Sequence, residues 1–486
     1  MSKRVSLRTL LPGLLLCATV AGLALAGYAL LSLYPMFPQS GEWFRLRHRH
    51  WQHLALHLDG YGHVPGSEVA VYLSAAPGGT VQLRLYDVLR RDTLLHDSTQ
   101  ADWQPLPDSA SVRGTGWEVS ARLRLPAAMP TGWYVLEARS RRSVAYTSLF
   151  VVPPRGNVQR RVAWLFSTNT WNAYNPWGGQ SLYTQPLVPT VSFRRPQPLA
   201  DPFLQPGLAR HQLFFQGANK DRYLAQLLDS LGVAYDAYDM MTLHRGDARL
   251  ADYDVLLIST HSEYWTTEML AHLRGLLDGG ASLLNFAGNV AAYRSYLNPQ
   301  QQTLTVHKHP DELWAVLDSS GLRPFGTGMY LMGFHTYAPY QVLVDSSWLL
   351  AGTGLKRGDL FGEKSETYDF THMYDHLGEQ LWGLLQQHRL GAASGLEVDK
   401  VYAGTPANWV TVARGLNPPV EGHGEVYPGA GLDWNGSGGA DLGYYWHPGG
   451  GLVVATSSMS FTGAIPYDPV LRQLVARALH KALAPR

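Results

Sequence analysis

The chain has 486 residues, too many for one ordinary hydrophobic core, so two or three domains are expected. Apolar residues make up 45% of it and charged residues 16%, which is typical of a globular protein and excludes a largely disordered one. The formal net charge of +1 gives no reason to expect nucleic acid as a partner. The single cysteine, Cys17, lies in the apolar N-terminal segment, so the rest of the chain has no disulfide framework, thiolate metal site or cysteine nucleophile.

The N-terminus has the pattern of a membrane signal. Basic residues within the first eight positions precede an almost uninterrupted apolar run over residues 10–34, long enough to cross a bilayer. We therefore expect a signal-anchor over residues 1–36, and a single-pass membrane protein whose soluble part lies on the periplasmic or extracytoplasmic side. The triplet Ala24-Leu25-Ala26 leaves a second interpretation open, in which the signal is cleaved and the protein is secreted.

Residues 37–50 are basic and contain proline, and we interpret them as a linker. From 51 to 153 the sequence consists of short alternating segments separated by turn signals such as Pro77-Gly78-Gly79, a spacing typical of an Ig-like β-sandwich. The predicted strands are Val69–Leu73, Val81–Tyr86, Trp117–Leu125, Trp133–Ala138 and Tyr146–Val152. The diproline Pro153-Pro154 is a plausible end for this domain.

The pattern changes after residue 160, where strands begin to alternate with helices. The expected strands are Val162–Phe166, Ala234–Tyr238, Val255–Ile258, Ala281–Phe286 and Leu452–Thr456, and the expected helices are Tyr223–Leu231, Glu268–Leu277 and Asp468–Leu483. Strand, helix and strand at this spacing predict an α/β domain over residues 160–486, with a doubly wound parallel sheet of the glutamine-amidotransferase or flavodoxin type. Residues 295–385 are rich in glycine and aromatics, and we expect them to form loops over the site.

Polar side chains follow several of these predicted strands. They occur in residues 167–183, in His261-Ser262-Glu263, in Gly288-Asn289 and, later in the chain, in Glu397-Val398-Asp399. Because strand ends of one sheet converge, a single cleft could hold phenols, a carboxylate, an imidazole and an amide. Each residue also has an ordinary explanation, as a helix-end charge or a turn residue for example. HExxH, a Walker loop, GxSxG and a GxGxxG after a strand are all absent.

Seven uncommon strings in these regions resemble a known family. They are TNTWNAYN with WGGQSLY, SFRRP, THSEYWT, GGASLLNFAGN, GLEVD and GGGLVVATSSMSFTGA, in this order from about residue 160 to 470. Together they are similar to the C-terminal catalytic domain of the N,N-dimethylformamidase large (beta) subunit. The resemblance implies a hydrolase acting on carbon–nitrogen bonds other than peptide bonds, in linear amides. The apolar N-terminal segment is not part of that pattern, which puts the same substrate in doubt.

The resemblance also implies a mononuclear Fe(III) site. Its metal ligands would be Tyr174, Tyr183 and Glu263, and its catalytic residues would be His261, Asn289 and Glu397. Asp399 is the alternative to Glu397 as the second carboxylate. In this scheme Tyr264 and Trp265 would form an apolar wall, and Ser262 would be structural.

The chemistry of these residues is consistent with that site. Hard anionic oxygen ligands suit Fe(III) better than Zn(II), which more often takes histidine or cysteine. We expect an iron-dependent hydrolase of small amides, with N-substituted formamides as one option, and a homo-oligomer is possible. The alternative is a non-catalytic exported module that binds a ligand or glycan in the same cleft.

Overall fold

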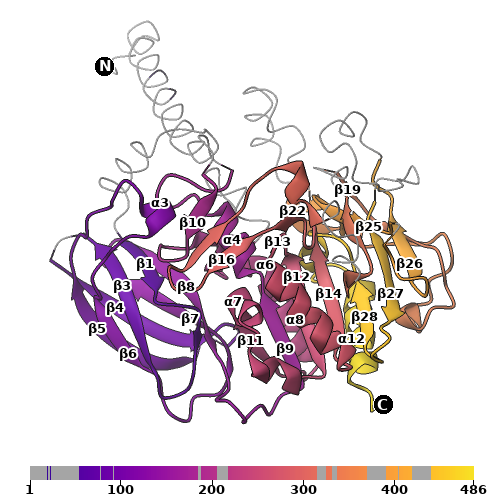
Figure 1. The fold of residues 1–486 in the computed structure, drawn as a ribbon, viewed down its shortest axis with the longest axis horizontal. Helices are drawn as coiled ribbons and strands as arrows, with labels where there is room; N and C mark the ends of the chain where they lie inside the picture. The colour runs from indigo at the N-terminus through magenta and orange to yellow at the C-terminus, as the bar shows by residue number, and fades with distance from the viewer. Residues whose placement is uncertain are drawn as a thin grey trace, which may run out of the picture.

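The computed structural model describes Thr19, Gly22 and most of the chain after residue 53. The described ranges are 54–76, 78–90, 92–183, 188–204, 217–314, 324–330, 336–368, 390–402, 404–418 and 439–485. Strands near the N-terminus lie at one end of the molecule, and a large central sheet extends from beside them to β26 and β27 at the other end (Figure 1).

Two sheets near the N-terminus enclose their own hydrophobic core. One has the order β1 (Leu54–Leu58), β3 (Glu68–Ala75), β6 (Ala121–Arg124), and the other β2 (Gly62–His63), β8 (Val144–Val151), β7 (Gly132–Arg139), β4 (Gly79–Asp87), β5 (Thr93–Ala101). The alternation in β4 explains this packing, because Val81, Leu83 and Leu85 are fully buried while Gln82 and Arg84 are less buried. The short helix α3 (Ala110–Arg113) follows β5.

The central sheet has nine strands and carries the largest core. Its order is β11 (Tyr235–Asp239), β9 (Val162–Phe166), β12 (Val255–His261), β14 (Ser282–Gly288), β28 (Leu452–Ala455), β27 (Asp441–Trp446), β26 (Val410–Gly415), β20 (Tyr340–Val342), β21 (Leu360–Phe361). The first five are parallel, and their apolar runs are buried on both faces, as parallel strands require. From β28 to β21 every pairing is antiparallel.

The prediction of a doubly wound parallel sheet is therefore wrong. The structure is β-rich, with 22% helix and several mixed or antiparallel sheets. The physical reason lies in the connections: residues 447–451, His-Pro-Gly-Gly-Gly, join β27 to β28 as a tight hairpin, and only antiparallel strands can be joined so directly. Gly451 permits the turn because a Cβ there would clash with the Ala281 carbonyl oxygen.

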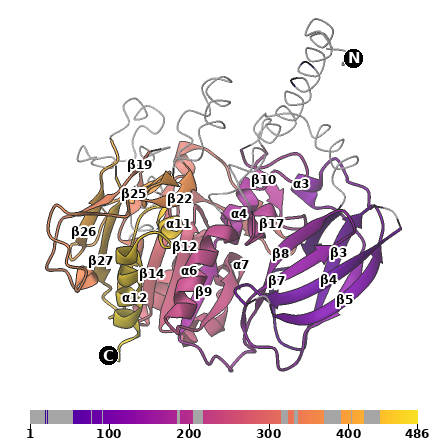
Figure 2. The ribbon, with the colours of Figure 1, turned by 180° about the vertical axis from the view of Figure 1, so that it is seen from behind.

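The helices connect or flank the parallel strands (Figures 1 and 2). They are α4 (Thr168–Tyr174), α6 (Ala218–Ser230), α7 (Met240–His244), α8 (Thr267–Asp278), α11 (Phe461–Ala464) and α12 (Pro469–Leu483). Side chains cap the starts of the two helices α8 and α12: the Thr266 hydroxyl accepts from the Met269 N–H at α8, and Asp468 accepts from the Val470 N–H at α12, where Pro469 occupies the first position.

Small sheets and single-turn 3-10 helices make up the rest of the described structure. The strand pairs are β10 (Thr190–Ser192) and β16 (Tyr296–Asn298) on either side of β17 (Thr303–Thr305), β13 (Tyr264–Trp265) with β15 (Tyr293–Arg294), β18 (Gly328–Tyr330) with β25 (Val398–Lys400), β19 (Tyr337–Ala338) with β24 (Ser394–Gly395), and β22 (Ser365–Tyr368) with β23 (Leu390–Gly391). Residues 295–385, expected as loops, thus contain several short strands.

The predicted membrane topology needs correction as well. In the described part of the chain no helix has the length and apolar character to span a bilayer. The predicted segment, residues 10–34, falls outside the described residues apart from Thr19 and Gly22.

Candidate active site

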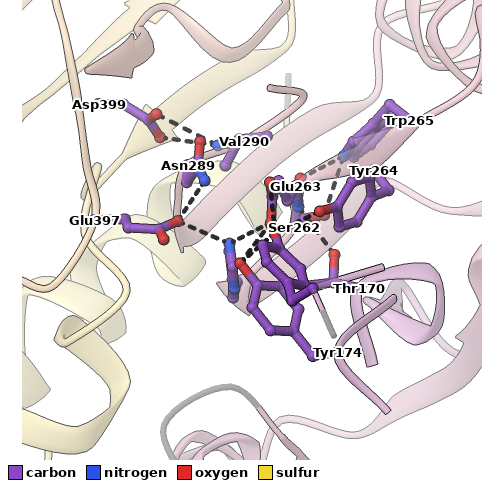
Figure 3. A network of polar contacts seen from close by, with 12 residues as sticks. Thr170, Tyr174, Ser262, Glu263, Tyr264, Trp265, Asn289, Val290, Glu397 and Asp399 are labelled. Atoms are coloured by element: carbon purple, nitrogen blue, oxygen red, sulfur yellow. Dashed lines mark hydrogen bonds and ion pairs between the residues drawn. The ribbon is translucent and has the colours of Figure 1, made fainter. Parts of the chain in front are cut away.

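A cluster of buried polar side chains lies at the carboxyl ends of the parallel strands (Figure 3). Strand β12 ends at His261 and its neighbour β14 ends at Gly288, directly before Asn289. Helix α4, which follows β9, ends at Tyr174. The parallel strands thus bring three separate polar segments to one edge of the sheet.

Two phenol groups converge on one carboxylate. The Tyr174 hydroxyl donates to Glu263 Oε2 at 2.9 Å, and the Tyr183 hydroxyl lies 3.0 and 2.9 Å from the two Glu263 oxygens. The two hydroxyls are 2.6 Å apart, and the rings stack with centroids 4.1 Å apart. Tyr183 is 39% exposed as a whole residue, and its hydroxyl contacts the cluster through Glu263.

Helix α4 is attached directly to the segment that carries Glu263. The Glu263 N–H donates to the Thr170 hydroxyl at 3.0 Å, and Asn169 Nδ2 donates to the Tyr264 carbonyl at 3.1 Å. All four residues that these bonds join, Thr170, Asn169, Glu263 and Tyr264, are buried. These bonds fix the distance between Tyr174, at the end of α4, and the Glu263 carboxylate.

His261, Asn289 and Glu397 form the other half of the cluster. His261 Nε2 lies 3.1 Å from Glu397 Oε2 and 3.4 Å from Glu263 Oε2. Asn289 Nδ2 donates to the same Glu397 oxygen. The Asn289 amide nitrogen therefore donates to a Glu397 oxygen that also lies close to an imidazole nitrogen (Figure 3).

Asp399 lies behind this half of the site and holds its backbone. It is fully buried and accepts from the Val290 N–H at 3.3 Å, and burial raises its pKa to about 8. The turn that it holds is strained, because Asn289 and Ala291 have φ of 51° and 52°. Glu397, and not Asp399, is the carboxylate that faces His261.

Burial strongly disfavours ionised phenols here. It raises the pKa of Tyr174, Tyr183 and Tyr264 well above the ordinary value of 10, and the neighbouring Glu263 carboxylate raises these pKa values further. The phenols can therefore lose their protons in this cluster only if another cation compensates the charge. That requirement fits a metal bound between them.

Two residues of the cluster were not assigned polar roles from the sequence. Tyr264 was expected in an apolar wall, yet its hydroxyl lies 2.5 Å from the Tyr183 hydroxyl. Lys308 places its ammonium 2.9 Å from the Tyr183 ring centroid and 5.7 Å from that of Tyr264, and burial lowers its pKa to about 8. Its sequence neighbourhood carries no motif that could have identified it. Trp265 is fully buried, and its indole donates to the Ser262 carbonyl.

The described residues offer two overlapping sets of metal donors. One is the set predicted from the sequence, Tyr174, Tyr183 and Glu263. The other is His261, Glu263 and Glu397, whose ligand atoms all lie within 4.8 Å of one another, so this buried group could hold a metal ion. Both sets include Glu263.

Comparison with known proteins agrees with the resemblance seen in the sequence. A search of curated proteins finds no match. Over residues 84–472 the chain matches the family described as N,N-dimethylformamidase beta subunit-like, C-terminal. The match begins in β4 and ends in α12, so it includes every residue of the cluster. Because it covers well over half of the sequence, this chain belongs to the N,N-dimethylformamidase beta subunit-like, C-terminal family.

Proposed function

We propose that this protein hydrolyses the carbon–nitrogen bond of a linear amide at a mononuclear ferric site. Tyr174, Tyr183 and Glu263 would hold the ion, and His261, Asn289 and Glu397 would carry out the acid–base and hydrogen-bonding chemistry. The observation that carries the proposal is the convergence of two phenol hydroxyls on the two oxygens of one carboxylate, within 3.0 Å, in a chain of this family.

The donor set suits Fe(III) in charge and in hardness. Two phenolates and one carboxylate supply three negative charges, which balance the three positive charges of a ferric ion. Anionic oxygen donors favour a hard cation, whereas Zn(II) sites more often use histidine or cysteine. When bound, the ion would polarise an amide carbonyl and lower the pKa of a water molecule.

Glu397 is placed to act as the base and then as the acid. It would take a proton from water as the water oxygen bonds to the carbonyl carbon, and deliver that proton to the amine nitrogen as the carbon–nitrogen bond breaks. The products are a carboxylic acid and an amine. Its carboxylate belongs to the described cluster but is not among the three proposed ligands.

His261 and Asn289 would stabilise the negative charge that develops on the carbonyl oxygen. Both nitrogens already lie close to one oxygen, that of Glu397, which supports a role for the pair around an oxygen atom of the substrate. Removing one such donor commonly costs about 3–4 kcal/mol of transition-state stabilisation. In this scheme Asp399 supports Asn289 through the backbone of the following residue.

The substrate class we propose is small linear amides, with N-substituted formamides among them, because the family description refers to an amidase of dimethylformamide. We further propose that the catalytic chemistry resides in residues 160–486 and that residues 51–153 form a separate packing domain. The N-terminal sheets surround their own apolar cluster, which supports this division, while Trp133 and Phe150 on them pack into the central core and join the two parts.

The test is amine release from a panel of formamides and acetamides by the full chain loaded with iron. We expect turnover of at least one amide, and its loss in Glu263→Gln. The matched control is Glu268→Gln, a change at a 58% exposed side chain on α8 that should retain activity. Binding of panel members without turnover in the iron-loaded protein would contradict the proposal and favour a non-catalytic binding module.

A further inference from the structure

The residue before His261 has an unusual backbone conformation. Thr260 has φ of 61°, in the left-handed region, and it is a buried, β-branched residue. Side chains branched at Cβ rarely adopt this region because of steric clashes, and such strain persists only where the surroundings enforce it. Thr260 is the second-last residue of β12, and the turn of the backbone there sets the direction of His261, the last residue of the strand, and of Glu263 beyond it.

A buried carboxylate holds this turn from behind. Asp221 Oδ1 accepts from the Thr260 hydroxyl at 2.7 Å and from the Ser259 hydroxyl at 2.6 Å. Asp221 lies in the first turn of α6, is 2% exposed, and is distant in sequence from both hydroxyls. Within the described part of the chain, the Asp221 carboxylate hydrogen-bonds to Ser259 and Thr260 and not to the phenol cluster. Its effect on the site therefore passes through the backbone of β12.

The hydroxyl directions around Asp221 are fixed by a wider network. Because the Thr260 hydroxyl proton is used toward Asp221, the Thr462 hydroxyl donates to the Thr260 oxygen, at 3.0 Å. The Trp164 indole donates to the Ser259 oxygen at 3.0 Å in the same way. Thr462 lies in α11, which packs on α6 (Figure 2). Helices α6 and α11 and strand β9 thus meet at this turn.

We propose that Asp221 is a positioning residue that holds Thr260 in its left-handed conformation and thereby places His261 and Glu263 for metal binding. As far as it concerns iron, this inference rests on the proposed function. A specific consequence follows from the backbone argument: glycine adopts the left-handed region without strain, so a glycine at position 260 should no longer need the carboxylate.

The test is a double-mutant cycle of Asp221→Ala and Thr260→Gly in the full chain, read by ferric ion affinity. In the presence of Thr260, Asp221→Ala should weaken ferric ion binding at least about tenfold, which corresponds to about 1.4 kcal/mol. On the Thr260→Gly background the same change should alter affinity by less than about threefold. Asp221→Asn should stay near the parent, because its amide oxygen can accept both hydroxyls. Asp229→Ala, at an exposed position on the same helix, is the control.

A second readout needs no metal. In metal-free protein, the hydrogen-exchange rates of the amides of residues 259–263 should be at least about tenfold higher in Asp221→Ala than in the parent. The double variant should show no such increase when it is compared with Thr260→Gly. Equal effects of Asp221→Ala on both backgrounds would overturn the inference. If Asp221→Ala alone does not fold, the comparison of Thr260→Gly with the double variant still decides. A protein that binds no iron but shows the exchange cycle would refute the proposed function and leave the positioning role supported.

Discussion

Replacing Tyr183 by phenylalanine should abolish iron binding, whereas replacing Glu397 by glutamine should abolish turnover and leave the iron in place. The two variants separate the two donor sets in the structure. If the phenols hold the ion, Tyr183 is a ligand and Glu397 is a base. If the ion instead lies between His261, Glu263 and Glu397, the roles are reversed.

The expected size of the Tyr183→Phe effect follows from its contacts. Its hydroxyl lies within 3.0 Å of both Glu263 oxygens and 2.6 Å from the Tyr174 hydroxyl, so the variant removes one of three donors. Replacing a residue that does not touch the metal and only orients one of its ligands typically lowers metal affinity about 10- to 100-fold. Loss of a donor should therefore exceed about 100-fold, roughly 2.7 kcal/mol. Folding should change little, because the ring can stay stacked on Tyr174.

The Glu397→Gln effect should appear in kcat. A positioned general acid or base typically contributes about 10²- to 10⁴-fold, and we expect a loss in that range. Glutamine keeps the size of the side chain and can still accept from Asn289. Ferric ion affinity should consequently remain within about threefold of the parent.

Both variants can be measured by titrating ferric ion into metal-free protein against a competing chelator, with the phenolate-to-iron absorption band recorded at each point. Amine release gives kcat for the loaded proteins. A Glu397→Gln protein that loses iron, beside a Tyr183→Phe protein that keeps iron and colour, would refute the phenolate site. The Glu268→Gln protein controls for the general effect of a charge change.

Three further changes test the surroundings of the site. Tyr264→Phe removes a hydroxyl that lies 2.5 Å from the Tyr183 hydroxyl. The variant should bind iron about 10- to 100-fold more weakly and show a shifted absorption band. An unchanged titration and spectrum would exclude a role for the Tyr264 hydroxyl. Burial raises the pKa of Asp221 from 3.8 to about 6, so the fold favours its protonated form. The free energy of unfolding should therefore fall by on the order of 3 kcal/mol as the pH rises from about 4 to about 6. Urea unfolding of Asp221→Asn across that pH range should lack this fall. The same dependence of the unfolding free energy on pH in both proteins would contradict the prediction. Gly288→Ala would place a Cβ 2.7 Å from the Glu397 carbonyl oxygen. We expect this variant to lose about 1–3 kcal/mol of stability and to have a reduced kcat. Unfolding and kcat like those of the parent would show that the site does not need this close approach.

The sequence predicted the parallel part of the central sheet well because local patterns determine it. Residues 162–166 were expected as a strand and form β9 with the same bounds, and the expected helix 268–277 forms most of α8. Buried apolar runs followed by capped helices carry this information in a few neighbouring residues. The same strand ends correctly indicated that residues 174, 183, 261, 263 and 289 would lie close together.

Features that depend on distant pairings could not be derived from local patterns. Glu397 received its role in the site from the family resemblance, because its position is set by β25, which pairs with β18 about 70 residues earlier, and nothing in GLEVD reveals that partner. The helix expected from Tyr223 in fact begins at Ala218, which places Asp221 inside its first turn and beneath Thr260. Tyr264 was interpreted through its apolar ring, because the direction of its hydroxyl is a tertiary property.

The most direct test of this account is iron analysis and a visible absorption spectrum of the purified full chain. We predict one iron per chain and a phenolate-to-iron charge-transfer band that is lost in Tyr183→Phe. A folded protein that takes up no iron and remains colourless after incubation with ferric ion would contradict the proposed site.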